Sequence, residues 1–358
     1  MTITPTLLVR HRAGEYPIYV YPGALGDLAS LTERHAAGRK PVVISDRNVA
    51  EKVGNPLNAP MLTFPAGEAS KSRAEWARLT DDLLGRGIGR DAVIVALGGG
   101  VTGDLAGFVA ATYLRGVPVF QVPTTLLAMV DASVGGKTGI DTGHGKNLVG
   151  AFHQPVAVLA DPACLATLPD AEFRTGIAEA IKHAVIADAG LFDRLDTERE
   201  KLLSRDPEAM TDLVRANVRI KAGVVEEDEQ ETGRRAILNA GHTVGHAIET
   251  ALEYRVAHGD AVAIGLVCEA RIAEQMGIAT PGTADRISHL LASFGLPVAP
   301  PPGLPGGLIE LMKRDKKSSA GAIHCALPMG IGAMAGSDSR GWTTVVPEAL
   351  LRGAFSIS

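Results

Sequence analysis

Three histidines and one carboxylate in the second half of the sequence have spacings that suit a metal site. His242 and His246 are four residues apart in a segment with helical periodicity, so their side chains share one helix face. His258 follows twelve residues later, and Glu179 lies on a separate, largely apolar predicted helix. These residues could supply three protein ligands and leave a fourth position open for substrate, although spacing alone does not select among the histidines. A protease of the H-E-x-x-H type is excluded because its general-base Glu is absent. His183, a lone histidine on the helix of Glu179, is better explained as a core residue.

A glycine-rich turn follows a predicted buried strand at residues 92–97. Gly98, Gly100 and Gly103 satisfy the spacing G-x-G-x-x-G before a predicted helix, a pattern typical of a backbone turn that approaches a pyrophosphate. The acid that usually binds the ribose about 20 residues later is absent from the segment QVPTT. We therefore expect a dinucleotide whose ribose is held by a residue elsewhere in the sequence. Asp104 would be stabilised at the helix start by the helix dipole even without a ligand.

Residues 131–150 form a second glycine-rich block, in which Lys137 follows paired glycines and Lys146 precedes Asn147. It is not a Walker loop, because the G-x-x-x-x-G-K-[ST] spacing is absent. Two interpretations stay open: a surface turn with solvated lysines, and a cradle for an anion. The two glycine-flanked lysines favour the cradle. Thr124 and Thr125 precede this block and would lie at the carboxyl edge of a sheet, where ligands of such folds bind.

The residue types together favour metal-assisted oxidation of a phosphorylated, carboxylated polyol. The sequence offers a dinucleotide turn, candidate ligands for a metal with one open position, and scattered cations; the cations are Arg115, Lys137, Lys146, Lys182, Lys221 and Arg235. The residues alone do not define the reaction.

Composition limits the class of protein that carries these residues. A chain of 358 residues is long enough for two domains at about 150 residues each. With 46% hydrophobic and 21% charged residues, neither a disordered chain nor a coiled coil is expected. The formal net charge of −5 argues against nucleic acid or an anionic membrane as a partner, because both require a dominant basic surface.

Cysteine usage and the N-terminal segment favour a cytoplasmic protein. Cys164, Cys268 and Cys325 are far apart and form no C-x-x-C pair, so neither a disulfide framework nor a cysteine-zinc site is expected. The first residues lack a signal-peptide pattern, and no stretch approaches the roughly 18 apolar residues of a membrane span.

The predicted elements that position the chemistry change in character along the chain. Short β-branched runs alternate with helical patterns in the first half; they lie at residues 18–21, 42–45, 92–97, 117–122 and 156–160. Such alternation predicts a largely parallel sheet covered on both faces. After residue 163 the periodicity is mainly helical. We predict an α/β, Rossmann-like, NAD-binding domain over residues 1–162 and a mainly α-helical metal- and substrate-binding domain over residues 163–358.

These segments resemble the 3-dehydroquinate synthase family of the sugar-phosphate cyclase group over nearly the whole chain. The motifs that carry the resemblance are GEASKS at 67–72, GGGVTGDLAGFVAATYLRG at 98–116, VPTTLLAMVDASVGGKTGID at 122–141, GKNLVGAFHQP at 145–155, GIAEAIKHA at 176–184, LNAGHTVGHAIE at 238–249, HGDAVAIG at 258–265 and RDKK at 314–317. The resemblance implies Zn²⁺, with Co²⁺ as a substitute, on Glu179, His242 and His258. His246 is then left for catalysis or substrate contact. A homodimer is also expected from the resemblance.

The same resemblance assigns two further groups of residues. The implied NAD site comprises Asp46, Glu68, Lys71, Gly99, Gly100, Asp104, Thr124, Thr125, Lys137, Lys146 and Thr167. Asp46 or Glu68 would then supply the acid for the ribose. The implied substrate contacts are Arg115, Asp131, Lys137, Asn147, Lys182, Lys221, Glu231, Arg235, Asn239, His246 and one of Lys316 and Lys317.

The reaction implied by the resemblance belongs to the shikimate pathway of aromatic amino acid biosynthesis. It converts 3-deoxy-D-arabino-heptulosonate 7-phosphate to 3-dehydroquinate and phosphate. NAD would take a hydride from C5 and so acidify the C6 proton; phosphate would leave, the same NADH would reduce the ketone, and ring opening with aldol closure would follow. Zinc would act as a Lewis acid on the substrate hydroxyls.

Three alternatives differ in recognisable features. Amino-dehydroquinate synthases and cyclases of sedoheptulose 7-phosphate share the metal and NAD motifs, whereas Arg235 and the Lys316–Lys317 pair favour a substrate with a carboxylate. Iron-type alcohol or glycerol dehydrogenases share the glycine turn but lack the GKN block and usually place Asp at the position of Glu179. A metal-stabilised NAD-binding regulator would leave the cations unexplained.

Overall fold

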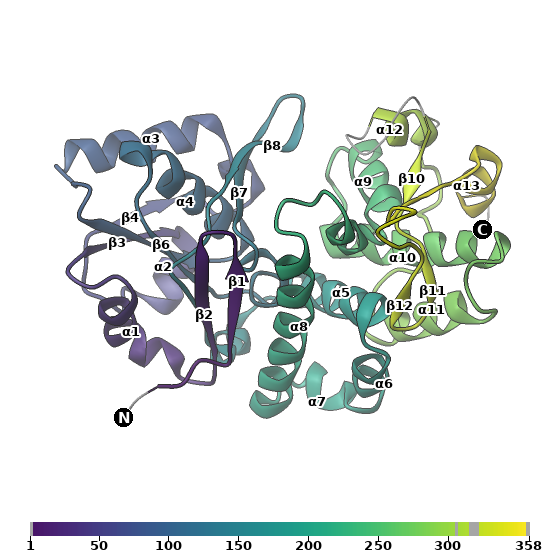
Figure 1. Cartoon of the computed structure of the whole chain (residues 1–358), viewed down its shortest axis with the longest axis horizontal. Coiled ribbons are helices and arrows are strands. Elements are labelled where there is room, and N and C mark those ends of the chain that lie inside the picture. Colours follow the sequence, from purple (N-terminus) through teal and green to yellow (C-terminus); the bar gives the residue numbers. More distant parts are fainter. Residues whose placement is uncertain (1–2, 305–306, 315–321, 356–358) are drawn as a thin grey trace. The chain divides into compact units, whose positions relative to one another are not determined.

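The computed structural model describes residues 3–304, 307–314 and 322–355 (Figure 1). The chain forms two compact units, of which the first comprises Met1–Leu168 with Met210–Glu226 and the second Pro169–Ala209 with Glu227–Ser358. Helix α8 (Pro207–Glu227) therefore belongs mostly to the first unit, although it follows three helices of the second. The predicted domain division at residues 162–163 remains a prediction.

The first unit is built on a seven-stranded sheet in the order β1-β2-β9-β6-β5-β3-β4. Its strands are β1 (Leu7–His11), β2 (Gly14–Val20), β3 (Lys40–Asp46), β4 (Met61–Phe64), β5 (Ala92–Gly98), β6 (Val119–Pro123) and β9 (Ala157–Ala160). Only β1 and β2 pair in antiparallel fashion, and the remaining pairs are parallel. The predicted α/β fold with a largely parallel sheet is confirmed.

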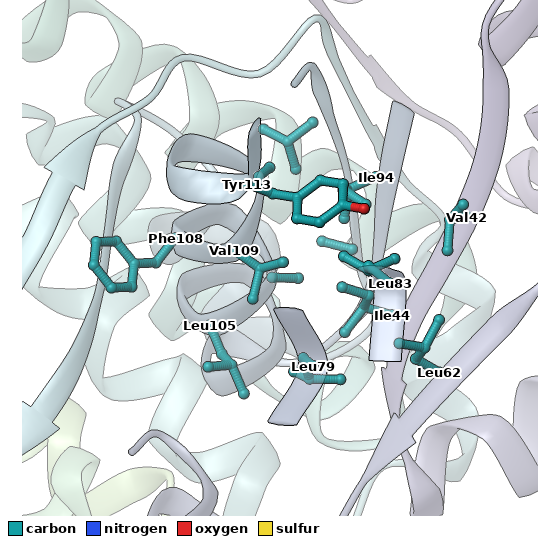
Figure 2. Close-up of a cluster of buried hydrophobic side chains, with 14 of the residues drawn as sticks. Val42, Ile44, Leu62, Leu79, Leu83, Ile94, Leu105, Phe108, Val109 and Tyr113 are labelled. Atoms are coloured by element: carbon teal, nitrogen blue, oxygen red, sulfur yellow. The ribbon is translucent and has the colours of Figure 1, made fainter. Parts of the chain in front are cut away.

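Helices cover both faces of this sheet. Leu79 and Leu83 of α3 (Arg73–Gly85) and Leu105 of α4 (Gly100–Thr112) pack with Ile44 and Ile94 on one face, as Figure 2 shows. The intervening strand residues, including Val43, Val93 and Val95, face the other side and pack with α1 (Leu28–His35) and α2 (Arg47–Val53). Every residue of β5 is buried, because a central parallel strand has no solvent face.

The second glycine-rich block forms an antiparallel hairpin of β7 (Lys137–Thr142) and β8 (Gly145–Phe152). A Cβ atom on Gly150 would lie only 2.1 Å from the carbonyl oxygen of Thr138. The glycines in this block therefore permit close pairing of two strands, a role that the sequence interpretation as a turn or cradle did not anticipate.

The second unit is mainly helical, as predicted. Its helices are α5 (Asp170–Ala187), α6 (Ala189–Thr197), α7 (Arg199–Leu203), α9 (His242–Ala251), α10 (His258–Gln275), α11 (Thr283–Ser293), α12 (Leu308–Arg314) and α13 (Glu348–Phe355). Helix α10 is central and contacts α5, α9, α11 and α13. Two small two-stranded sheets complete the unit: β10 (His324–Cys325) with β13 (Thr344–Val345), and β11 (Pro328–Gly330) with β12 (Ala333–Met334). Among the helices of the described residues, none combines the length and apolar content needed to cross a membrane.

Candidate active site

Glu179, His242 and His258 meet inside the second unit. One carboxylate oxygen of Glu179, Oε1, lies 3.5 Å from Nε2 of His242 and 3.3 Å from Nε2 of His258. One ligand atom from each of the three residues lies within 4.8 Å of the others. Two imidazole nitrogens and a carboxylate oxygen are a donor set that suits Zn²⁺ or Co²⁺. The three residues therefore fit a metal with a fourth position open.

The backbone around His242 orients its ring for this role. The Nδ1 atom of His242 lies 3.1 Å from the carbonyl oxygen of Ala240, so a proton on Nδ1 would be donated to that carbonyl. The Nε2 atom facing Glu179 would then carry the free lone pair that a metal requires.

Contacts between glycines and neighbouring backbones allow the three helices to come this close. A Cβ atom on Gly265 of α10 would lie 1.9 Å from the carbonyl oxygen of Gly241, just before α9. A Cβ on Gly259 of α10 would lie 2.4 Å from Cα of Thr175 on α5. Because any larger residue would push the helices apart, the small residues near the histidines set the positions of the ligands.

Burial and neighbouring charges act in opposite directions on the two histidines. Burial lowers the pKa of His258, but the carboxylates of Glu179 and Glu249 outweigh it and raise that pKa to about 9. Burial lowers the pKa of His242 well below its usual value, opposed by Glu179 and reinforced by Lys182. In the absence of a metal, a proton at this cluster would therefore reside on His258.

Lys182 lies beside the same carboxylate, one helical turn after it on α5. Its Nζ atom is 2.5 Å from Oε2 of Glu179, and the two side chains are 2% and 1% exposed. The two oxygens of Glu179 thus have different neighbours, with the ammonium group at Oε2 and the histidines at Oε1. His183 on the next position is fully buried, as expected for a core histidine.

The other predicted substrate contacts of the second unit lie just before or on α9. The ring of His246 is 5.1 Å from that of His242, measured between centroids. Asn239 donates from Nδ2 to Oε1 of Glu231 at 2.8 Å, and Arg235 is 2% exposed and donates from Nη1 to the carbonyl oxygen of Glu229. Lys316 and Lys317 lie outside the described residues.

In the first unit, predicted NAD residues gather at the carboxyl edge of the sheet. Asp46 ends β3, Gly99 follows β5 and Thr124 follows β6. The chain proceeds from β3 outward to β4 and then returns to β5 on the other side of β3. The point between β3 and β5 is therefore a switch point of the topology, where open α/β sheets bind ligands. Oγ1 of Thr124 is buried and has no hydrogen-bond partner among the described residues, which leaves it available to a ligand.

The glycine turn is closely packed at this edge. A Cβ on Gly99 would lie 3.0 Å from the side chain of Thr125, and one on Gly98 would lie 2.3 Å from Oγ1 of Thr102. Thr102 in turn donates to Oδ2 of Asp46 at 3.3 Å. Gly100 begins α4, so the N-terminus of this helix lies at the sheet edge where Asp46 and Thr124 lie.

Two ion pairs between a buried lysine and a half-buried aspartate lie in the same unit. Nζ of Lys71 is 2.5 Å from Oδ2 of Asp104, and Nζ of Lys221 is 2.7 Å from Oδ1 of Asp131. Burial lowers the pKa of Lys71, but Asp104 and Glu68 outweigh burial and raise it. Lys221 reaches Asp131 because α8 packs in the first unit.

The remaining predicted residues of the first unit are more exposed. Lys137 begins β7 with an exposed side chain, and Lys146 lies on β8 beside Asn147, whose backbone N–H is bound by Asp141 Oδ1 at 2.8 Å. Thr167 ends a 3₁₀ turn, Pro162–Thr167, that follows β9 at the carboxyl edge.

Arg115 is the member of the predicted set that lies apart. It follows α4 and precedes β6, so it lies at the amino edge of the sheet, whereas the glycine turn lies at the carboxyl edge. Helix α4 has 13 residues, which separates the two ends by about 20 Å. Arg115 is exposed and has a positive φ of 66°. Within this unit it is not brought together with the NAD residues.

The family models described as 3-dehydroquinate synthase N-terminal and 3-dehydroquinate synthase C-terminal match residues 61–175 and 176–318. A 3-dehydroquinate synthase from Symbiobacterium thermophilum is 46% identical over 329 residues, which is 88% of this chain and 92% of that protein. One from Pelobacter propionicus is 46% identical, covering 91% of this chain and 94% of that protein.

Solved structures of related cyclases share the fold over almost the whole chain. A 2-deoxy-scyllo-inosose synthase complexed with carbaglucose-6-phosphate, NAD⁺ and Co²⁺ has a TM-score of 0.86 at 26% identity, covering 98% of both chains. A 2-epi-5-epi-valiolone synthase from Streptomyces hygroscopicus with NAD⁺ and Zn²⁺ has a TM-score of 0.84 at 28% identity, covering 95% of both chains. A probable glycerol dehydrogenase from Sinorhizobium meliloti, at 18% identity and TM-score 0.68 over 94% of this chain and 95% of that one, shares the fold alone.

The parallel sheet with its glycine turn, followed by a helical unit with a two-histidine, one-glutamate cluster, places the chain in the class of sugar-phosphate cyclases. The dehydrogenases share that fold at lower identity. Both family models and the curated relatives then narrow the class, and the chain belongs to the 3-dehydroquinate synthase family.

Sequence reasoning missed two features of this site. Glu249 had no role assigned, although a buried acid seven residues after His242 lies on the same helix face as both histidines. The second is the packing role of Gly259 and Gly265 on α10. The glycines of the segment HGDAVAIG, inside a predicted helix where glycine is otherwise unfavourable, were the available signal.

Proposed function

We propose that this protein converts 3-deoxy-D-arabino-heptulosonate 7-phosphate to 3-dehydroquinate and phosphate. The observation that carries the proposal is the convergence of Glu179, His242 and His258 on α5, α9 and α10. It occurs in a chain 46% identical over most of its length to relatives named 3-dehydroquinate synthase. This is phosphate-eliminating cyclase chemistry, a carbon-oxygen lyase activity.

We also propose NAD and Zn²⁺ as cofactors, with Co²⁺ able to replace zinc. Related cyclase structures contain NAD⁺ with Co²⁺ or Zn²⁺, and the donor set of this chain suits either metal. When bound, NAD would accept and return a hydride, and the metal would stabilise negative charge on the substrate oxygens.

The residues of the first unit would hold the dinucleotide. The N–H groups at Gly99 and Gly100 lie at the start of α4 and would bind the pyrophosphate. Asp46 lies beside them at the switch point, where its carboxylate would accept hydrogen bonds from a ribose. Glu68, Lys71, Asp104, Thr124, Thr125, Lys137, Lys146 and Thr167 complete the proposed cofactor set.

Buried cations would bind the phosphate and carboxylate of the substrate. Lys182 and Arg235 are each 2% exposed, and buried cations form strong charge-assisted hydrogen bonds with anions. His246 lies beside the metal cluster and would contact the reacting part of the substrate. The proposed set also includes Arg115, Asp131, Lys137, Asn147, Lys221, Glu231, Asn239 and the Lys316–Lys317 pair.

The test is a turnover assay with the heptulosonate phosphate and an amount of NAD far below that of the substrate. We expect phosphate release that continues through many turnovers of each NAD, with no accumulation of NADH in the absorbance spectrum. Stoichiometric NADH would show an ordinary dehydrogenase. Turnover of only the amino analogue, or only of sedoheptulose 7-phosphate, would assign a different cyclase.

A further inference from the structure

Glu249 is a buried carboxylate beside the proposed metal site. It lies on α9 on the same face as His242 and His246, and it is 2% exposed. Its Oε1 atom is 3.4 Å from Nδ1 of His258 on α10. A charged side chain is rarely buried to this extent without a partner that compensates its lost hydration.

The ring of His258 is held between two carboxylates through its two nitrogens. Nε2 is 3.3 Å from Oε1 of Glu179, and Nδ1 is 3.4 Å from Oε1 of Glu249. A neutral imidazole has one N–H and one lone pair. Without a metal both nitrogens of His258 would carry protons, and a metal would displace one of them. If Glu249 accepts the Nδ1–H, the lone pair left for the metal is on Nε2.

We propose that Glu249 is a positioning residue, which fixes the tautomer and the ring orientation of His258 so that Nε2 can bind the metal. The inference rests on the metal site of the proposed function and not on its substrate. Ligating histidines commonly donate their second N–H to a carboxylate, which makes the ligand more basic. The Nδ1 atom of His242 faces the backbone carbonyl of Ala240 instead, and a substitution does not remove a backbone group. The hydrogen bond that orients a ligating histidine can therefore be tested by substitution at Glu249.

A direct metal contact by Glu249 is the competing interpretation. His246, Glu249 and His258 also offer ligand atoms within 4.8 Å of one another. His258 belongs to both sets, so if each set held a metal its ring would bind one metal through each nitrogen. That would require the ring to lose both of its N–H protons, which is unfavourable for an imidazole. The set with Glu179 is favoured because it takes Nε2 from both histidines and leaves an acceptor at each Nδ1.

The experiment compares Zn²⁺ binding by the wild-type protein, E249Q, E179Q and a matched control, E274Q. Glu274 lies on α10, the helix of His258, and its carboxylate accepts the backbone N–H of Ala284 at 2.9 Å. Dissociation constants would come from competition with a chromophoric chelator. We expect E249Q to retain one equivalent of zinc with affinity reduced about 10- to 100-fold. E274Q should bind as the wild type does, and E179Q should lose the site.

Two further measurements separate positioning from a structural role. The visible spectrum of the Co²⁺ form should change in E249Q and not in E274Q, because the imidazole orientation changes at the metal. In case E249Q does not fold, ¹⁵N NMR of the zinc-loaded wild-type protein should show His258 protonated at Nδ1.

Three outcomes would overturn the positioning role of Glu249. Unchanged zinc affinity of a folded E249Q, or protonation of His258 at Nε2, would overturn the proposal. Loss of zinc as complete as in E179Q would make Glu249 a ligand and would also overturn it. Zinc binding is measured without substrate, so absence of phosphate release by the wild type would refute the proposed reaction and leave this inference intact.

Discussion

The contact between Gly265 of α10 and Gly241 before α9 can be tested by adding one methyl group. In G265A the new Cβ would lie 1.9 Å from the carbonyl oxygen of Gly241 and 2.9 Å from the backbone nitrogen of Gly245. Both atoms belong to the backbone, so neither can move by a change of rotamer. The two helices would have to separate by about 1.5 Å to restore ordinary contact.

The expected cost follows from overpacking in a buried core. Insertion of one methyl group against a rigid neighbour costs about 1–3 kcal/mol. The clash is with a backbone atom at 1.9 Å, so the upper end of this range applies. In a helix the change from glycine to alanine also contributes up to about 1 kcal/mol of stabilisation, which leaves an expected net loss of roughly 2 kcal/mol. His242 follows Gly241 directly, and we expect zinc affinity to fall as well.

The matched control is G223A on α8. Gly223 is exposed, and its added Cβ would meet nothing within 4 Å, so the substitution should stabilise the helix by about 0.5–1 kcal/mol. Free energies of unfolding from urea titration, with zinc affinity from chelator competition, give the comparison. A G265A protein that unfolds at the wild-type urea concentration and binds zinc as tightly would refute the packing argument.

Three further predictions concern single charged or ligating side chains. H258A should remain folded but lose zinc and turnover, and stoichiometric zinc after dialysis would contradict the ligand assignment. K71M leaves the carboxylate of Asp104 without its ammonium partner and should destabilise the protein by about 3–5 kcal/mol; unfolding titrations should show partial recovery in K71M/D104N. Burial raises the pKa of Asp228, but hydrogen bonds from the backbone N–H groups of Thr232, Gly233 and Arg235 outweigh it and lower the pKa. The stability contributed by this carboxylate is therefore present above the usual pKa of 3.8 and is lost as pH falls through the lower native value. D228N should lower the melting temperature at about pH 7 and have little effect below that native pKa; an effect independent of pH would contradict the charge argument.

Several elements of the fold were predictable because their signals are local. The five predicted strands correspond to β2, β3, β5, β6 and β9, since a buried parallel strand must be a continuous apolar run. The glycine turn was also predictable from local signals, because strand, glycines and helix follow one another directly in the sequence. The β7–β8 hairpin was not, because its glycines are also compatible with an open loop.

For the candidate site, the sequence determined which residue types were available but not how they combine. The spacing of His242 and His246 placed them on one face of one helix, yet the structure directs His242 and His258 toward Glu179. The reason is that ligands on three helices meet only through helix packing, which depends on the glycine contacts of α10. Local periodicity contains no information on such contacts.

By itself, the sequence determined a two-part protein with a parallel α/β sheet and a helical second half, because hydrophobic periodicity and turn residues act over a few positions. It also determined the motifs on which the family resemblance depends. Only the tertiary structure decided that α8 joins the first unit and places Lys221 beside Asp131. It also decided that Glu249 faces Nδ1 of His258. These contacts join residues that are far apart in the chain, so they depend on how whole helices pack and not on any local pattern.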